Sequence, residues 1–473
     1  MFKKIKEFFR VLGELKYIIP LLKYKFPDPD DNESLAHSFE KTVEEFGNNN
    51  FIFFEDESWS YSETNKAANS LANKLIEDGV THSDRVVLFM ENRPDFIISI
   101  LALNKIGAIG VLINTSLTGK PLIHCINSSD SKKCIVGAEL AASLEAVLDE
   151  INIKDKEDIY WVEDGDRFIC PEWALSLKPL LDDSKDENLA ITNMVTAKDT
   201  AFYIFTSGTT GVPKAALFPN SKIIAASINI SKGGYRINDS DCMYNCLPLY
   251  HSTGLMLGLC ACVQVGAATF IRRKFSASAF WKEAKQFNTT AFVYVGELCR
   301  YLSFQDPSEE EKDNPISSMV GNGLRPDLWD CFRNRFNVER IIEIYGASEG
   351  NALFMNLLNK DETIGMTNAH VALFEYDVAE DKLVRDTESK FIEVDEGQPG
   401  LLLVEIGPDA IYNGYTDKKA SEEKVISNVF EEGDRWFNTG DLVKTMDVGF
   451  SLGRTHYQFV DRVGDTFRWK SEN

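Results

Sequence analysis

The sequence predicts an α/β fold in which parallel sheet structure is flanked by helices, followed by a small antiparallel barrel or sheet. Helical segments alternate with short apolar strands over most of the chain, as in parallel sheets that are buried on both faces. The length of 473 residues exceeds one ordinary core, so two or three subdomains are expected. Beyond about residue 362 the pattern changes to short strands between turns.

The first elements show the alternation most clearly. A hairpin is expected at Phe51–Phe54 and Trp59–Tyr61. The predicted helices and strands that surround it are helix Leu35–Phe46, helix Ser62–Asp78, strand Arg85–Met90, helix Asp95–Ile106 and strand Ala108–Asn114. Gly79 ends the second of these helices, because glycine readily takes the left-handed conformation that closes a helix.

The pattern continues through the middle of the chain and predicts two ranges, 34–361 for the α/β subdomains and 362–463 for the small β unit, before a last range of 464–473. Further elements of the α/β part are expected at Lys133–Val136, Ile159–Val162, Thr200–Phe205, Ser221–Ile230, Cys242–Cys246, Ala267–Ile271, Ala291–Tyr294 and Arg340–Ile344. Strands of the β unit are expected at Val371–Tyr376, Phe391–Val394, Gly400–Val404, Trp436–Asn438 and Tyr457–Val460.

Residues 1–26 differ from the rest of the chain. Seven basic and two acidic residues give this segment a net charge of +5, whereas the remaining chain carries −28. Apolar residues recur at helical spacing until Pro20 interrupts them. A basic helix of this kind binds anionic membrane surfaces or packs on its own domain, and the sequence leaves both alternatives open. Pro27–Glu33 then forms an acidic linker.

Composition limits the class of protein. The net charge of −23 argues against a nucleic-acid binder, which needs a basic surface. Nine cysteines without a Cys-x-x-Cys pair indicate buried free thiols and a reducing, cytoplasmic setting. A peripheral location on the inner face of a membrane is an alternative within the cytoplasm. Two apolar stretches, Ile97–Ile113 and Leu255–Ile271, are interpreted as core helix–strand pairs rather than transmembrane helices.

The most informative segment is Phe202–Lys214, where an apolar strand enters a loop of hydroxyl residues, two glycines, a proline and a lysine. Glycines let backbone N–H groups approach an anion, hydroxyls add donors and lysine adds charge. The alternative is a Ser/Thr/Gly-rich surface turn. The loop lies after a predicted strand, where open α/β sheets bind ligands. The predicted phosphate ligands are Thr206, Ser207, Gly208, Thr209, Thr210, Gly211 and Lys214.

The order Thr-Ser-Gly-Thr-Thr-Gly-x-Pro-Lys resembles the phosphate loop of the adenylate-forming enzymes, which comprise acyl-CoA synthetases, luciferases and peptide-synthetase adenylation domains. Later motifs follow in the family's order. They are Val320–Pro326 for adenine, Tyr345–Asn351 for the Tyr-Gly-x-Ser/Thr-Glu motif, Thr439–Asp441 for ribose and Asp461–Asn473 for the hinge. The resemblance implies two parallel-type sheets flanked by helices plus a small β-barrel subdomain.

The hinge motif, together with Ser348 in the Tyr345–Glu349 motif, resembles the fatty-acid transport protein branch, which contains long-chain and very-long-chain acyl-CoA synthetases. The resemblance implies an ATP-, Mg²⁺- and CoA-dependent ligase that forms an acyl-adenylate and then acyl-CoA, AMP and pyrophosphate. Alternatives are a membrane-surface protein for fatty acid uptake, a ligase for bile acids or carnitine-like acids, and a non-catalytic ATP-binding remnant.

The resemblance also implies roles for individual residues. Catalytic roles fall to Thr206, Lys214, His251 and Glu349, and Glu349 is the implied Mg²⁺ ligand. Nucleotide contacts are implied for Gly321, Asn322, Gly323, Tyr345, Gly346, Ser348, Glu349, Asp441 and Arg462. The alternatives are purely structural roles. Tyr345 would then pack in the core, His251 would be a core histidine with its hydrogen bonds made within the protein, and Glu349 would be a solvated acid on a loop.

The acyl chain and the end of the sequence complete the expectations. Tyr294–Tyr301 resembles the segment beside the acyl tunnel, in which Gly296 is expected to leave room for methylenes. Family members continue beyond the hinge into a small C-terminal domain that supplies a catalytic lysine, so the resemblance implies that this domain is absent here. Relatives are often dimers, which makes a homodimer an open expectation.

Overall fold

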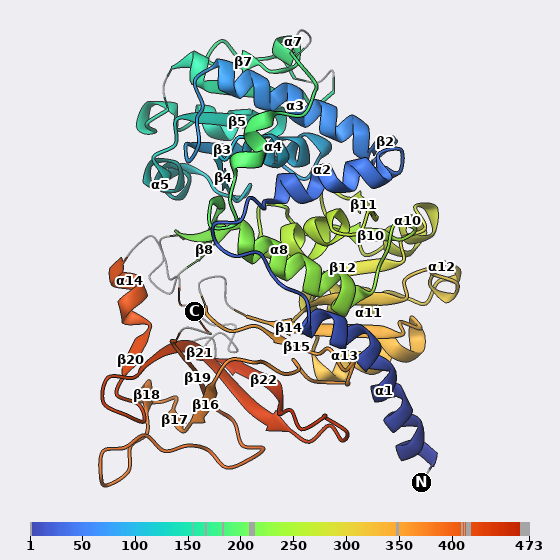
Figure 1. Cartoon of the computed structure of the whole chain (residues 1–473), viewed down its shortest axis with the longest axis vertical. Coiled ribbons are helices and arrows are strands. Elements are labelled where there is room, and N and C mark those ends of the chain that lie inside the picture. The colour runs from blue at the N-terminus through green and yellow to red at the C-terminus, as the bar shows by residue number, and fades with distance from the viewer. Residues whose placement is uncertain are drawn as a thin grey trace.

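The computed structural model describes residues 2–153, 155–165, 168–181, 184–207, 213–346, 350–407, 410, 412 and 418–463. Two mixed, largely parallel sheets lie one above the other in Figure 1, and a separate antiparallel sheet lies below them. The predicted α/β class, with a distinct small β unit after it, is therefore confirmed.

The upper sheet has seven strands. In spatial order they are β7 (Leu175–Ser176), β6 (Ile159–Val162), β5 (Lys133–Gly137), β3 (Arg85–Phe89), β4 (Ile109–Leu112), β8 (Thr200–Ser207) and β9 (Pro213–Pro219). All neighbouring pairs are parallel except β8–β9. Val86 and Leu88 pack into one core and Val87 and Phe89 into another, because successive side chains of a strand point to opposite faces.

Helices cover both faces of this sheet. They are α2 (Leu35–Phe46), α3 (Tyr61–Glu77), α4 (Pro94–Lys105), α5 (Gly119–Ser129), α6 (Ala141–Glu145) and α7 (Lys178–Leu181), with short 3₁₀ turns η1 (Ala138–Leu140), η2 (Leu148–Glu150), η3 (Lys156–Asp158) and η4 (Ala190–Met194). Ser34 caps α2 by accepting from the His37 N–H, and Ser60 and Glu63 form a reciprocal capping box on α3. These caps fix where the two helices begin.

The lower sheet has eight strands. In spatial order they are β15 (Phe354–Met355), β14 (Arg340–Tyr345), β13 (Ser318–Asn322), β12 (Ala291–Val295), β10 (Cys242–Asn245), β11 (Ala268–Ile271), β1 (Asn50–Phe54) and β2 (Glu57–Ser60). The strands from β14 to β1 are parallel, and the pairs at the two ends are antiparallel. The upper sheet therefore has an antiparallel pair at one edge, and the lower sheet has one at each edge.

One continuous apolar core joins the two sheets, since it contains residues of α3 and α4 as well as Val293, Val320 and Ile342 of the lower sheet. The helices of the lower half are α8 (Asn220–Ile228), the π-helical segments η5 (Asn229–Tyr235), η6 (Thr253–Cys260) and η7 (Cys331–Arg335), α9 (Ala261–Val263), α10 (Phe280–Gln286), α11 (Gly296–Ser303), α12 (Glu309–Lys312) and α13 (Pro326–Asp330). A second core, which contains Phe280 and Trp329, lies between the other face of the lower sheet and helices α10, α11 and α13.

The small β unit contains β16 (Val371–Phe374), β17 (Tyr376–Asp377), β18 (Lys382–Leu383), β19 (Gly400–Glu405), β20 (Val425–Ser427), β21 (Arg435–Met446) and β22 (His456–Arg462), with helix α14 (Lys418–Glu423). Strand β21 pairs antiparallel with β19, β20 and β22, so it is the centre of the unit. Leu402 and Leu403 point into cores on opposite faces of this sheet.

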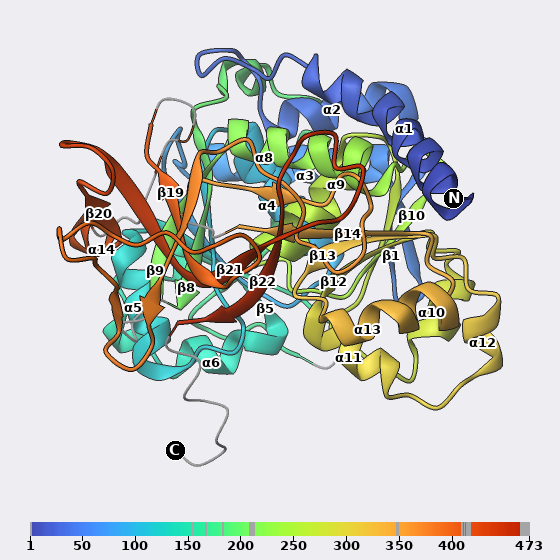
Figure 2. The same cartoon turned by 90° about the horizontal axis from the view of Figure 1, so that it is seen from below.

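Helix α1 (Phe2–Leu22) lies along the outside of the lower half, on the side of the molecule opposite β19 and β20 (Figure 2). Val11, Ile18 and Leu21 are buried against the body. The Glu14 carboxylate is also buried and contacts the guanidinium of Arg340 at 2.9 Å. Helix α1 therefore packs on its own chain through one face.

The predicted helices and strands are confirmed where the local sequence pattern was strong. The predicted helix Leu35–Phe46 has the bounds of α2, and Ile97–Ile113 and Leu255–Ile271 form helix–strand pairs in the core. None of the described helices combines the length and apolarity that a membrane span requires. All nine cysteines are free thiols, seven of them buried, as expected.

Candidate active site

The predicted phosphate loop connects the antiparallel strands β8 and β9, in which Thr206 pairs with Lys214 and Ser207 with Pro213. The loop therefore spans the end of a hairpin at the edge where β8 ends. Gly208, Thr209, Thr210 and Gly211 lie outside the described residues. Thr206 Oγ1 is buried and has no hydrogen-bond partner in the part of the chain that the structure describes. A buried hydroxyl without a partner is unfavourable, so this oxygen suits a bound polar ligand.

Two predicted nucleotide residues from different parts of the chain meet directly. The Tyr345 hydroxyl, at the end of β14, donates to Oδ2 of Asp441 in β21 at 2.5 Å. Arg462 in β22 lies 3.6 Å from Oδ1 of the same carboxylate. Desolvation and the Asp441 charge raise the pKa of Tyr345, so its hydroxyl stays protonated and can donate. The structure thus brings Tyr345, Asp441 and Arg462 together.

Local geometry of the Thr439–Asp441 segment explains how Asp441 is held. Thr439 Oγ1 donates to the Leu402 carbonyl at 2.9 Å and accepts from the Asp441 N–H at 3.1 Å. Gly440 has φ +74°, a left-handed conformation that side chains disfavour. The ladder between β21 and β22 shifts register between Leu442 and Val443, beside this turn. Such irregularities reorient side chains next to functional sites.

The predicted adenine segment begins within β13 and continues into the loop after it. Asn322 and Gly323 are exposed, and Gly323 has φ +82°. Gly321 is buried, and a Cβ there would lie 2.1 Å from the Tyr294 carbonyl oxygen. The absence of a side chain at Gly321 therefore accommodates Tyr294, and the surface available to a ligand in this segment is that of Asn322 and Gly323.

The expectation that Gly296 leaves room for acyl methylenes is wrong. A Cβ at Gly296 would lie 1.7 Å from the carbonyl oxygen of Gly323, so backbone already fills that space. The glycine is needed because the start of α11 and the loop after β13 pack backbone to backbone. The segment Tyr294–Tyr301 nevertheless lies beside the predicted adenine segment, since β12 and β13 are neighbours.

His251 lies in the segment after β10, in which the Leu247 carbonyl accepts from Asn92, a residue between β3 and α4, at 2.8 Å. Its ring keeps contact with solvent, although the surrounding protein desolvates it and lowers its pKa. Nδ1 accepts from the Thr253 N–H at 3.3 Å, so the proton of the neutral ring is on Nε2. His251 is thus positioned to be a neutral donor at pH 7.

The motif that starts at Tyr345 is described only at its ends. Ser348 and Glu349 lie outside the described residues, and Gly346 is exposed. After the motif, Asn351 donates to the carbonyls of Glu405 at 2.8 Å and Ala410 at 3.1 Å. These bonds attach the motif to the end of β19. In the described residues, no group of three or more His, Cys, Asp or Glu side chains is arranged to hold a metal.

The most informative residue that sequence reasoning missed is Glu343 of β14. Its carboxylate is buried and accepts from the Tyr294 hydroxyl at 2.6 Å and from the N–H groups of Gly323 and Leu324 at 3.0 and 2.9 Å. Desolvation raises the pKa of Glu343 to about 7. The available signal was an acidic residue within the apolar run Ile341-Ile342-Glu343-Ile344.

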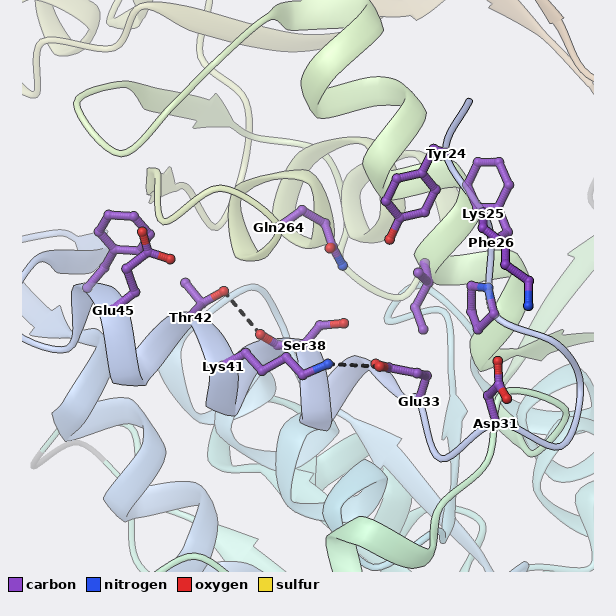
Figure 3. Close-up of a pocket in the computed structure, with 13 residues that line it drawn as sticks. Tyr24, Lys25, Phe26, Asp31, Glu33, Ser38, Lys41, Thr42, Glu45 and Gln264 are labelled. Carbon is purple, nitrogen blue, oxygen red and sulfur yellow. Dashed lines mark hydrogen bonds and ion pairs between the residues drawn. The ribbon is translucent and has the colours of Figure 1, made fainter. Parts of the chain in front are cut away.

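A cavity of about 360 Å³ lies away from these motifs, between the linker after α1 and helix α2. Lys41 and Glu33 form an ion pair of 2.8 Å along it (Figure 3). Tyr24, Phe26 and Gln264 also line it. None of the predicted site residues does, so the cavity is separate from the candidate active site.

Comparisons with known proteins agree with the motifs. Residues 39–416 match the family described as AMP-binding enzyme. Medium/long-chain-fatty-acid–CoA ligase FadD6 of Mycobacterium tuberculosis is 38% identical over 445 residues, which cover 94% of this chain and 71% of that protein. Long-chain fatty acid transport protein 6 of Mus musculus is 37% identical over 433 residues, which cover 89% of this chain and 68% of that protein.

Solved structures share the fold. The N-terminal domain of FACL13 from Mycobacterium tuberculosis matches with a TM-score of 0.70 and 20% identity, over 91% of this chain and 100% of that chain. The anthranilate CoA ligase AuaEII, in complex with anthranoyl-AMP, matches with a TM-score of 0.75 and 18% identity, over 94% of this chain and 80% of that chain. The predicted family is confirmed: this chain belongs to the AMP-binding enzymes, with fatty acid–CoA ligases and fatty acid transport proteins among its relatives.

Proposed function

We propose that this protein activates a medium- or long-chain fatty acid with ATP and transfers the acyl group to CoA. The observation that carries the proposal is the convergence of Tyr345, Asp441 and Arg462, which come from β14, β21 and β22. The Asp441 carboxylate is only 6% exposed, and it is suited to accept hydrogen bonds from ribose hydroxyls. The substrate class is supported by the relative that is 38% identical, a medium/long-chain fatty acid–CoA ligase.

The reaction brings two anions together, so the site has to neutralise charge and fix orientation. Thr206 and Lys214 are proposed to hold the β- and γ-phosphates, together with the intervening loop residues. Glu349 is proposed to bind Mg²⁺, a hard cation that prefers carboxylate oxygen and offsets phosphate charge. His251 is proposed to orient the carboxylate or the incoming thiol with the N–H of its neutral ring.

The experiment is mass spectrometry of products after incubation of the 473-residue protein with ATP, Mg²⁺, palmitate and CoA. We expect AMP and palmitoyl-CoA. Cholate and carnitine replace palmitate in parallel reactions, because the alternative ligases would use those acids. Turnover of another acid without turnover of palmitate would contradict the fatty acid assignment. ATP binding without any acyl-adenylate or acyl-CoA would favour the alternative of a non-catalytic remnant.

A second function, contact with a membrane surface, is favoured by the outward face of α1. Large apolar side chains are exposed there, with Phe9 at 65% and Leu22 at 70% exposure. The exposed members of this stripe are Ile5, Phe8, Phe9, Leu12, Ile19 and Leu22. Lys16 and Lys23 are exposed on the same helix and the segment that follows it, in a chain that is otherwise acidic. This combination suits the surface of an anionic bilayer.

Co-sedimentation with vesicles of phosphatidylcholine and phosphatidylserine tests this contact. Phe9→Glu with Leu12→Glu is expected to abolish sedimentation with anionic vesicles. The matched control Ile76→Glu places a charge at an exposed apolar position of α3 and is expected to change nothing. Equal sedimentation of both variants would remove α1 as the contact. Sedimentation analysis without lipid tests the separate expectation of a homodimer.

A further inference from the structure

Three neighbouring strands carry one buried row of residues where they approach the candidate active site. Tyr294 of β12 pairs with Gly321 of β13, and Gly321 pairs with Glu343 of β14. Residues in register on parallel strands project from the same face of a sheet. Since neighbouring strands lie about 4.8 Å apart, about 10 Å separates the backbones of Tyr294 and Glu343.

The glycine in the middle of this row lets the outer two side chains meet. A Cβ at Gly321 would lie 2.7 Å from Cγ of the Tyr294 ring, so any other residue would displace the ring. The Tyr294 ring lies over Gly321, and its hydroxyl donates to Oε1 of Glu343 at 2.6 Å. Tyr294 and Glu343 are both buried, which makes the loss of either partner costly.

The same carboxylate holds the backbone of the predicted adenine segment. Gly323 N–H donates to Oε2 at 3.0 Å, and Leu324 N–H donates to Oε1 at 2.9 Å. On its other side, Gly323 packs directly against the backbone of Gly296 at the start of α11. The loop is thus held between Glu343 and the segment that starts at Tyr294.

The chemistry of these contacts argues for a purpose beyond packing. All three donors are neutral, and burial raises the pKa of Glu343 to about 7, so ionisation of this acid near neutral pH is costly. An apolar side chain of similar volume would avoid this cost, but it would leave the N–H groups of Gly323 and Leu324 without their acceptor. What the acid adds is a fixed position for this loop.

We propose that Glu343 is a positioning residue for the nucleotide, which fixes the Gly323–Leu324 backbone against the base. Its bond to Tyr294 joins this position to Tyr294–Tyr301, which the family resemblance places beside the acyl tunnel and which we call the acyl segment. The inference rests on the proposed function, because it takes the loop after β13 to contact adenine.

The test compares Glu343→Gln and Tyr294→Phe with the matched control Tyr244→Phe. Tyr244 lies in β10 of the same sheet and donates to Glu283 at 2.5 Å, away from the adenine segment. The readouts are KM and kcat for ATP and for GTP, with palmitate and CoA saturating. Thermal denaturation of each variant identifies any that does not fold.

We expect Glu343→Gln to raise KM for ATP at least fivefold and to reduce the preference for ATP over GTP, with kcat within about twofold. A carboxamide keeps one acceptor oxygen but places an NH₂ group against a loop N–H. Tyr294→Phe is expected to raise KM for ATP by a smaller factor, and Tyr244→Phe is expected to leave it unchanged. Equal effects of Tyr294→Phe and Tyr244→Phe would overturn the link to the acyl segment.

An unchanged KM and base preference in folded Glu343→Gln would overturn the positioning role. If Glu343→Gln does not fold, Tyr294→Phe decides in its place, because it removes one of the bonds that hold the Glu343 carboxylate and adds no donor. An unchanged KM for ATP in that variant would then overturn the positioning role. Failure of the proposed function is a different result, namely no acyl-CoA from the wild-type protein. In that case, calorimetric titration with ATP and GTP tests Glu343 through binding alone.

Discussion

The Tyr345 hydroxyl donates a 2.5 Å hydrogen bond to the carboxylate of Asp441, although 96 positions separate the two residues in the chain. Tyr345 ends a strand of the lower α/β sheet, and Asp441 lies in the central strand of the antiparallel unit. This bond therefore joins the two parts of the molecule at the candidate nucleotide site. Phe354 and Phe459 flank the Tyr345 ring, at centroid distances of 5.4 and 6.2 Å.

Tyr345→Phe is expected to weaken ATP binding while the fold is retained. The Tyr345 hydroxyl holds the Asp441 carboxylate in place, so KM for ATP is expected to rise when that orientation is lost. Steady-state kinetics with varied ATP measures this change. Tyr376→Phe is the matched control, because it removes a similar bond to Asp381 on the surface of the same β unit. An equal rise in both variants would contradict the assignment.

Thr206→Val is expected to weaken ATP binding without lowering the free energy of unfolding. The buried Thr206 hydroxyl has no partner among the described residues, so an isosteric methyl group should leave the free energy of unfolding unchanged or slightly higher. KM for ATP should rise at least tenfold if this hydroxyl serves the phosphates. The control is Thr269→Val in β11, whose hydroxyl is likewise buried without a described partner. A loss of stability in Thr206→Val alone would indicate a structural bond instead.

Glu14→Gln is expected to destabilise the protein. Glu14 contacts Arg340 and Arg236, and both Glu14 and Arg340 are buried, where desolvation lowers the pKa of Arg340 to about 10. Removal of one member of a buried ion pair costs about 3–5 kcal/mol, because a charge stays buried without its partner. Urea denaturation measures the loss. Glu309→Gln, in an exposed pair with Lys312, is expected to change little.

Glu343 is expected to make stability depend on pH. Its pKa is raised from 4.5 to about 7 in the folded protein, so the folded state binds the proton more tightly than the unfolded state. The stabilisation from this proton is complete below pH 4.5 and is lost as the pH rises to about 7. The groups that face Glu343 are Tyr294 and Cys299, and burial raises the pKa of both.

The free energy of unfolding of wild type relative to Glu343→Gln should therefore fall by about 3 kcal/mol between these limits. Denaturant titrations at several pH values measure the difference between the two proteins. A difference that stays constant from pH 4.5 to 7, or that grows as the pH rises, would contradict the burial-raised pKa.

Local patterns were sufficient to predict most of the fold. The helix Leu35–Phe46 was correct in both bounds, because its apolar spacing and the preceding Ser34 cap agree. Strand β13 was missed as an element, since Gly321 and Gly323 resemble a loop. Strand β9 was missed because Pro213 and Lys214 were assigned to the phosphate loop, although Lys214 is paired with Thr206 in the ladder. Glycine and proline are weak guides at strand ends.

The sequence predicts which residues belong to the candidate site, whereas the contacts between them depend on the fold. Motif order identified Tyr345 and Asp441, but their hydrogen bond depends on how a distant β unit docks. The error at Gly296 has the same cause, because the backbone that fills its space comes from Gly323. Glu343 was overlooked since a single acid in an apolar strand gains meaning only from the donors around it.

The most direct test of the account is calorimetric titration of the wild-type protein and Asp441→Asn with a non-hydrolysable palmitoyl-adenylate analogue, in which a sulfamoyl group replaces the phosphate. The analogue carries the nucleoside and the acyl chain together, and its binding does not depend on turnover. We expect the wild type to bind and Asp441→Asn to bind at least tenfold more weakly, because the substitution removes the charge between Tyr345 and Arg462. Equal affinities of the two folded proteins would contradict the placement of the adenylate at Asp441.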